Sequence, residues 1–325
     1  MEGYITAERI ANSIMQQNSF EGTHILVEGV KDIKVYTKFF QKEQVKLTQT
    51  FGKYKLREVF DILSLRGFNK KIAIRDADFL RLKDNRKFEV DYAIDIYPTD
   101  GHDSEVMMLA VNTLEDLLAV TVEQDKLDAF EKRIGESFKS RVIKMSYLIG
   151  CLRLANKRSG LGLLFKPAKQ GGNRIKFKKF VCDKEFNIDT SKMIHVISEY
   201  SKNRDTIVCA QQVITDNLDK VLMENHDVLE VINGHDVAEI TCILSSIGVK
   251  SKSDIFQHPD KLEEALAMCF DRNKFCSTNL YRKINDWKVK NDLEIFLVCD
   301  EFFQALNYLL KTTLPPVGVF LKMQK

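Results

Sequence analysis

The chain has 325 residues, which allows one large domain with an insertion, or two domains. Hydrophobic residues make up 44% and charged residues 29%, as in ordinary globular proteins, and only 5 prolines and 15 glycines argue against long disordered linkers. The N-terminal sequence lacks a signal-peptide pattern, and charges interrupt every apolar stretch. We therefore expect a soluble, cytoplasmic protein with no membrane association.

The net charge of +3 hides a strong segregation of charge along the chain. Residues 88–125 contain ten acids and no Lys or Arg, whereas residues 137–182 contain twelve Lys or Arg and no acid. Acidic clusters suit cations and basic clusters suit phosphates. The seven cysteines are scattered and contain no CxxC pair, so neither a zinc site nor a disulfide framework is predicted.

The first third of the chain alternates predicted helices and strands. Apolar and β-branched runs predict strands, and apolar residues at helical spacing predict helices. Such alternation indicates an α/β fold with a mainly parallel sheet. In chain order we predict a helix at 5–17, a strand at 23–27, a helix at 32–41, a strand at 45–51, a helix at 55–65, strands at 71–74 and 91–97, and a helix at 103–120.

The rest of the chain is predicted to be mostly helical. Residues 227–232 are an exception, because this short apolar run resembles a strand, and a helix at 237–246 would follow it. This late unit is expected to rejoin the first sheet. The predicted organisation is a catalytic domain at 1–125 rejoined by 226–250, a basic, mostly helical insertion at 126–225, and a helical C-terminal region at 251–325 with helices over 259–312.

Two acidic motifs follow predicted strands. Glu28 and Asp32 form the pattern E-G-x-x-D at a strand-to-helix junction, where Gly29 would admit a ligand or a positive φ. Asp76 and Asp78 form a D-x-D pattern, and on an extended segment both face the same side. In parallel sheets, ligands bind beyond the carboxyl ends of the strands. Converging carboxylates need a cation, and hard oxygen ligands favour one or two Mg²⁺ or Mn²⁺ ions over zinc.

Each motif alone also fits a purely structural role. Asp32 could cap a helix, and residues 76–78 could be a polar loop. The two motifs together, at successive strand ends, favour a metal site. A third acidic element, residues 102–105, opens the next predicted helix, where Glu105 is either a helix-capping acid or a second-metal ligand.

These motifs resemble the signature of the Toprim family. The resemblance covers Ile25 to Asp32 and Ile74 to Asp78, and the family includes topoisomerases, primases and OLD-type nucleases. It implies a Rossmann-like Toprim fold, in which Glu28 serves acid–base chemistry or metal binding. It also implies that Asp76 and Asp78 hold Mg²⁺, with Asp32 in support.

A second resemblance covers most of the chain. Residues 102–105, the turn at 233–236, and residues 278–281 with Trp287 are similar to a bacterial Toprim-like family found beside ABC-type ATPases. The effector subunit of the PARIS anti-phage system belongs to that family. This resemblance implies an abortive-infection nuclease that acts on tRNA, is held inactive by an ATPase partner, and forms a homodimer on activation.

The basic block is a candidate nucleic-acid surface. Phe165, Phe177 and Phe180 interleave with its cations, and aromatic rings can stack on bases while cations bind phosphates. A surface for an acidic protein partner stays open as the alternative. The candidate residues are Arg153, Lys157, Arg158, Lys166, Lys169, Arg174, Lys176, Lys178 and Lys179.

Three further possibilities define the range of functions. A Toprim nucleotidyl transferase and a non-catalytic regulatory or binding subunit are alternatives to a metal-dependent endonuclease. The chain lacks G-x-x-x-x-G-K-[ST] and G-x-G-x-x-G motifs, so ATPase and dehydrogenase activities are disfavoured.

His235 lies in the 233–236 turn, where a capping or buried histidine is favoured over a functional one.

Overall fold

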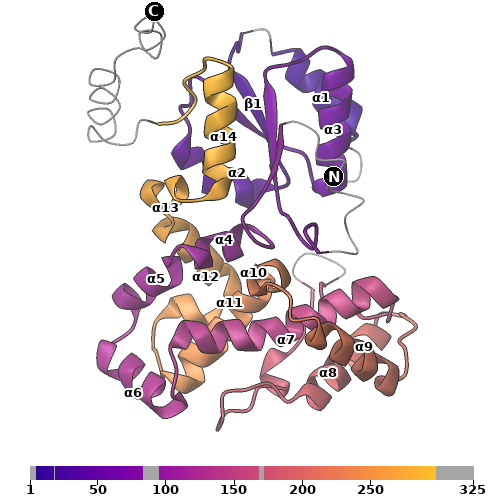
Figure 1. Ribbon diagram of the computed structural model, residues 1–325, viewed down its shortest axis with the longest axis vertical. Helices are drawn as coiled ribbons and strands as arrows, with labels where there is room; N and C mark the ends of the chain where they lie inside the picture. Colours follow the sequence, from indigo (N-terminus) through magenta and orange to yellow (C-terminus); the bar gives the residue numbers. More distant parts are fainter. Residues whose placement is uncertain (1–4, 18, 83–94, 168–171, 298–325) are drawn as a thin grey trace, which may run out of the picture.

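A four-stranded, all-parallel sheet forms the core of the N-terminal half (Figure 1). The computed structural model describes residues 5–17, 19–82, 95–167 and 172–297. The strand order is β2-β1-β3-β4, with Ile25 of β1 in register with Leu47 of β2 and Ile72 of β3. This confirms the predicted α/β class with a parallel sheet. The strands are β1 (Thr23–Val27), β2 (Val45–Gln49), β3 (Lys71–Arg75) and β4 (Ile96–Pro98).

Helices cover both faces of this sheet. Side chains alternate between faces along a strand, so Leu26 and Ala73 pack on one side, against α1 and α3. Ile25 and Ile72 point to the other side and join the larger core, which extends into the helical half. All four side chains are buried, as expected for central parallel strands. The helices next to the sheet are α1 (Ala7–Met15), α2 (Val30–Tyr36), α3 (Lys53–Leu65) and α14 (Asn279–Lys290).

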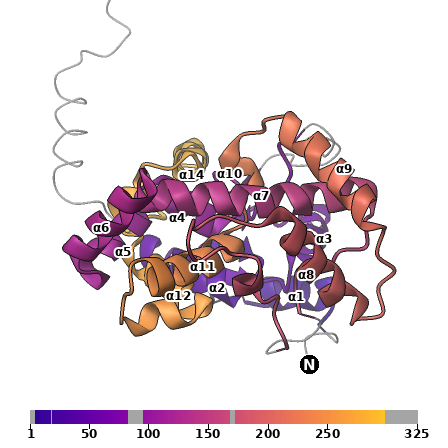
Figure 2. The same ribbon diagram turned by 90° about the horizontal axis from the view of Figure 1, so that it is seen from below.

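The second half of the molecule is helical and is built around the long helix α7 (Figures 1 and 2). Gly150 lets α7 pack closely on α10, because a Cβ there would lie 2.4 Å from the Val231 carbonyl oxygen. No helix in the described ranges is long and apolar enough to cross a membrane. The helices are α4 (Ser104–Ala110), α5 (Thr113–Thr121), α6 (Gln124–Ile134), α7 (Phe138–Ser159), α8 (Thr190–Lys202), α9 (Gln211–Met223), α10 (Val228–Val231), α11 (Gly234–Ile243), α12 (Pro259–Cys269) and α13 (Arg272–Cys276).

The segments that follow β3 and β4 join the sheet to the helical half. The His102 backbone N–H donates to the Leu229 carbonyl oxygen at 2.8 Å, and Arg81 pairs with Glu230 at 3.1 Å. Gly101 has a φ of +79°, and a Cβ at this position would lie 2.9 Å from the Leu229 carbonyl oxygen. The carboxyl edge of the sheet therefore lies against α10 and α11.

Two predicted elements are wrong. Residues 227–232 form helix α10, capped by Asp227, and not a strand, so this run adds nothing to the described sheet. A short apolar run fits a buried helix turn as well as a strand, and only packing against α7 decides between them. The helix predicted at 103–120 is broken at Asn112, whose left-handed φ of +62° separates α4 from α5.

Two predictions fall partly outside the described residues. Of the strand expected at 91–97, residues 83–94 lie outside the described ranges, and β4 covers Ile96–Pro98. The end of the predicted strand agrees with β4 to within one residue. The helices expected over 259–312 are confirmed as far as α14, and residues 298–325 lie outside the described ranges.

Candidate metal centre

The first acidic motif spans the junction between β1 and α2. The Glu28 Oε1 atom accepts a hydrogen bond from the Asp76 backbone N–H at 3.2 Å, which ties the two motifs together. Asp32 accepts from the Gly29 backbone N–H at 2.8 Å and so caps α2, as one of the two predictions for it allowed. Gly29 has an extended φ of −148°, so no left-handed conformation requires glycine there.

The second acidic motif lies just after β3, and its two acids face different partners. Asp76 Oδ1 accepts from the Ser104 backbone N–H at 3.2 Å. Asp78 has a left-handed φ of +50°, and its Oδ2 atom lies 2.7 Å from Lys53 Nζ and 3.5 Å from a guanidinium nitrogen of Arg75. The extended geometry predicted for residues 76–78 is therefore wrong, because β3 ends at Arg75 and the chain turns.

The carboxylates at this edge raise one another's pKa. Burial raises the pKa of Glu28 to about 7, and Asp78 and Asp32 add to this effect, although Arg75 opposes it. Burial together with neighbouring carboxylates also holds the pKa of Asp76 well above its ordinary value. Burial alone would raise the pKa of Asp78 too, but Lys53 outweighs it and lowers that pKa. A concentration of negative charge in a partly buried site is the electrostatic setting that a divalent cation stabilises.

Residues 102–105 extend this acidic region towards the helical half. Asp103 caps α4 by accepting from the Val106 backbone N–H at 3.0 Å, and it also accepts from the Gly234 backbone N–H at 2.7 Å. Glu105 lies in the first turn of the same helix, where its carboxylate interacts with its own backbone N–H. Burial, followed by the charges of Asp103 and Glu263, raises the pKa of Glu105 to about 8. Both roles predicted for Glu105 stay open, because an acid in the first turn of a helix complements the helix dipole and a buried acid among other acids is also stabilised by a cation.

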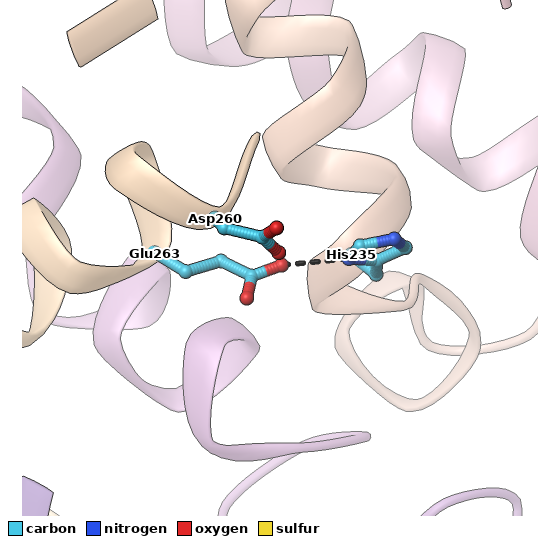
Figure 3. Close-up of side chains that lie close together, drawn as sticks. All are labelled: His235, Asp260 and Glu263. Carbon is cyan, nitrogen blue, oxygen red and sulfur yellow. Dashed lines mark hydrogen bonds and ion pairs between the residues drawn. The ribbon is translucent and has the colours of Figure 1, made fainter. Parts of the chain in front are cut away.

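A second group of possible metal ligands lies beside this region (Figure 3). One donor atom from each of His235, Asp260 and Glu263 lies within 4.8 Å of the others, so the group could hold a metal ion. His235 Nδ1 lies 2.7 Å from Glu263 Oε1. Lys31 forms an ion pair with Glu263 and lies 4.0 Å from Asp260, so a cation there would compete with the Lys31 ammonium.

The predicted ligands and this second group differ in spacing. Within the described ranges, no three of the predicted ligands bring donor atoms within 4.8 Å of one another. The predicted acids are instead coupled electrostatically, since the charges of Asp32, Glu28 and Glu105 all raise the pKa of Asp76. Their donor set is entirely carboxylate oxygen, which fits Mg²⁺ or Mn²⁺, whereas the imidazole of His235 suits transition metals.

The basic block divides into paired and exposed cations. Arg153 is bound by both carboxylate oxygens of the buried Asp236 at 2.6 Å and stacks on Phe165. Arg158 pairs with Glu224 at 2.9 Å. These arginines have structural partners that the sequence did not indicate, because the acids lie 66 and 83 residues away.

The remaining basic candidates are more accessible. The Lys157 ammonium lies over the ring of Phe79, and Lys169 lies outside the described ranges. Phe177 and Phe180 are buried in the core, so the expectation that they stack on bases is wrong. Exposed candidates are Lys166, Lys176, Lys178 and Lys179, and Arg174 is half-buried and pairs with Asp260 at 2.6 Å.

Several residues of the centre were not predicted. Lys31 and Lys53 neutralise carboxylates of the centre, and Asp260 and Glu263 supply acids from α12. Glu263 is buried, which is rare for a glutamate without a partner and is explained by its interactions with His235 and Lys31. Its sequence signal was only an acid on an amphipathic helix, which normally indicates a solvated face.

Neither the protein-family models nor the curated proteins give a match.

Proposed function

We propose that this chain is a Mg²⁺- or Mn²⁺-dependent nuclease of the Toprim type. The observation that carries the proposal is the convergence of carboxylates from separate strand ends at one edge of a parallel sheet. Glu28 and Asp76 are joined by a hydrogen bond of 3.2 Å, and Asp76 in turn accepts from Ser104 at the start of α4, which carries Glu105. This edge is where parallel sheets bind their ligands.

Each acidic residue has a distinct role in this proposal. Asp76 would hold the divalent cation together with Glu28 and Glu105, because the charges that act most on Asp76 are those of neighbouring acids. Arg75 and Lys31 offset part of the charge of Glu28 and Glu105, respectively. The bound cation would supply charge stabilisation for the attacking and leaving oxygens of a phosphodiester. Glu28, with a pKa near 7, would hold or release a proton at its carboxylate. Asp32 orients α2 and supports the site through its charge.

The cellular role in this proposal rests on the family resemblance. It makes the chain the effector of an anti-phage abortive-infection system, with tRNA as its substrate. An ABC-type ATPase subunit would control it, and activation would form a homodimer. The segregated basic block supports a polyanionic substrate.

A non-catalytic binding subunit is the second candidate. The observation that favours it is the pairing of two acids of the region with lysines. Asp78 pairs with Lys53 at 2.7 Å, and Glu263 pairs with Lys31. A site whose acids are all neutralised in this way would have no need of a metal, but Asp76 and Glu105 are not so paired in the described ranges.

The test is a cleavage assay with the purified full chain. Total tRNA and, separately, double-stranded DNA are incubated with Mg²⁺ or Mn²⁺, with EDTA, and with the variants Glu28→Gln and Glu43→Gln. Glu43 is an exposed acid outside the site and serves as the matched control. We expect metal-dependent cleavage of tRNA that Glu28→Gln abolishes and Glu43→Gln retains.

Binding of Mn²⁺, followed by electron paramagnetic resonance, separates a silent enzyme from a non-catalytic one. Binding by the wild type that weakens in Glu28→Gln supports the metal centre even if an ATPase partner is needed for turnover. Cleavage that survives in Glu28→Gln, or the absence of both cleavage and Mn²⁺ binding, overturns the proposal.

A further inference from the structure

A basic groove lies in the helical half, between the end of the basic block and helix α8. Its volume is about 860 Å³, which is large enough to enclose a nucleotide unit of a strand. Helix α8 lies in the part of the molecule opposite the sheet (Figure 1). One carboxylate, Glu199, and five basic side chains line the groove, and these five are Arg174, Lys176, Lys179, Lys192 and Arg204.

Some of these charges are already neutralised. Lys192 pairs with Asp189 at 3.0 Å. Glu199, the one carboxylate that the described residues contribute to the lining, pairs with Lys202 at 3.0 Å. Neither partner lines the groove. Glu199 therefore does not offset the remaining cations of the groove.

Three positive charges are left without a carboxylate. Lys176 and Lys179 are exposed and form no ion pair within the described part of the chain. Arg204 donates to the carbonyl oxygens of Tyr200 and Asn173, both at 2.8 Å, and stacks on the Tyr200 ring. These interactions fix the Arg204 guanidinium in place but leave its charge uncompensated. Fixed, uncompensated cations in a concave surface attract successive phosphates.

Arg174 connects the groove to the second group of possible metal ligands. This residue lines the groove, and its guanidinium pairs with Asp260 at 2.6 Å. Asp260 belongs to the group with His235 and Glu263, which contacts Lys31 at the start of α2 (Figure 3). Ion pairs therefore link the groove, through Arg174 and Asp260, to Lys31 of α2, the helix that follows β1.

We propose that this groove binds the phosphodiester backbone of the nucleic acid strand whose scissile phosphate enters the carboxylate centre. The inference rests on the proposed nuclease function. The sequence placed the nucleic-acid surface in the basic block alone, and the groove adds Lys192 of α8 and Arg204, which follows α8, to that surface. A concave, basic groove fits a strand better than an acidic protein, which would need a broad, flat interface.

The test measures binding apart from cleavage. Fluorescence anisotropy of labelled tRNA is recorded in EDTA over a series of salt concentrations, with the full chain carrying Lys176→Glu and Lys179→Glu together. Lys220→Glu is the matched control, because Lys220 is exposed on α9 and lies outside the groove. Circular dichroism confirms that each variant is folded.

We expect the double variant to raise the Kd for tRNA at least about tenfold. The slope of log Kd against log salt should fall by about two, because two phosphates of the strand are no longer neutralised by lysines. The control should stay within about twofold of the wild type. An unchanged Kd and slope in the double variant overturn the inference even if the chain cleaves tRNA. If the wild type binds tRNA and the double variant does not, the strand-binding role of the groove is supported even if no cleavage is found.

Two competitors distinguish other occupants of the groove. Mononucleotides or polyglutamate are added to the complex with labelled tRNA. Displacement by a mononucleotide at concentrations comparable with tRNA would make the groove a nucleotide pocket, and equal displacement by polyglutamate would make it a site for an acidic protein. Either result overturns the strand-binding inference, and weak competition by both supports it.

Discussion

Neutralising Glu105 should stabilise the metal-free protein at alkaline pH. In Glu105→Gln, an amide of nearly the same shape replaces a carboxyl group whose pKa is raised from 4.5 to about 8 by burial and by the charges of Asp103 and Glu263. The side chain lies at the junction between the sheet and α11, so its ionisation occurs inside a packed region.

The direction in which stability changes with pH follows from proton binding. Between pH 4.5 and 8 the folded chain holds a proton on Glu105 that the unfolded chain has released, so the stability falls as the pH rises through this window. The full rise in pKa corresponds to at most about 5 kcal/mol. Because Lys31 offsets part of the charge and water and side chains reorganise around it, we expect about 2 kcal/mol.

Urea unfolding in EDTA at pH 5 and pH 8 measures this effect. At pH 5 the free energies of unfolding of the wild type and Glu105→Gln should agree within about 1 kcal/mol, because this pH is close to the ordinary pKa of 4.5, where the effect of the raised pKa has only begun to accumulate. At pH 8 the variant should be more stable by about 2 kcal/mol. The exposed Glu43→Gln serves as the control and should follow the wild type at both pH values.

Excess Mg²⁺ adds a second arm to the experiment. At pH 8 it should stabilise the wild type more than Glu105→Gln, since a cation that binds only the folded state stabilises it by mass action. Equal loss of stability between pH 5 and pH 8 in both proteins would refute the reasoning about a buried, ionising carboxyl group. Equal stabilisation by Mg²⁺ would refute its role near the cation.

Two substitutions test the packing around the site. Arg153→Met leaves the fully buried Asp236 without its bidentate partner, so we expect the free energy of unfolding in urea to fall by about 3 kcal/mol. An unchanged free energy of unfolding would contradict a buried ion pair. Gly234→Ala places a Cβ 2.4 Å from the Cβ of Glu105, so we expect the free energy of unfolding to fall by about 2 kcal/mol and Mn²⁺ binding to weaken. A variant with wild-type stability and wild-type Mn²⁺ binding would show that α11 can shift to accommodate the methyl group.

The sheet and its acidic edge were predictable because their signals are local. The strands β1 and β3 are compact apolar runs followed by polar residues, and parallel strands buried on both faces require such runs. Glu28 and Asp76 directly follow two of these strands, and neighbouring parallel strands bring their carboxyl ends together. The hydrogen bond between them at 3.2 Å agrees with that expectation.

The helical half was predictable only as a class. Residues 227–232 are as apolar as a strand, yet they form α10, since their burial is satisfied by packing against α7. The break at Asn112 was also missed, because a single residue in a left-handed conformation leaves the apolar periodicity of residues 103–120 almost unchanged.

The sequence by itself determined the α/β class, the segregation of acids from bases, and the acids that follow the strands. Only the tertiary structure decided which charges meet. In the folded chain, Asp78 pairs with Lys53, and the buried Glu263 contacts both His235 and Lys31. Arg153 forms an ion pair with the buried Asp236. The reason is physical, because secondary structure depends on local spacing, whereas a charge acts on whatever lies within a few ångströms of it once the chain is folded.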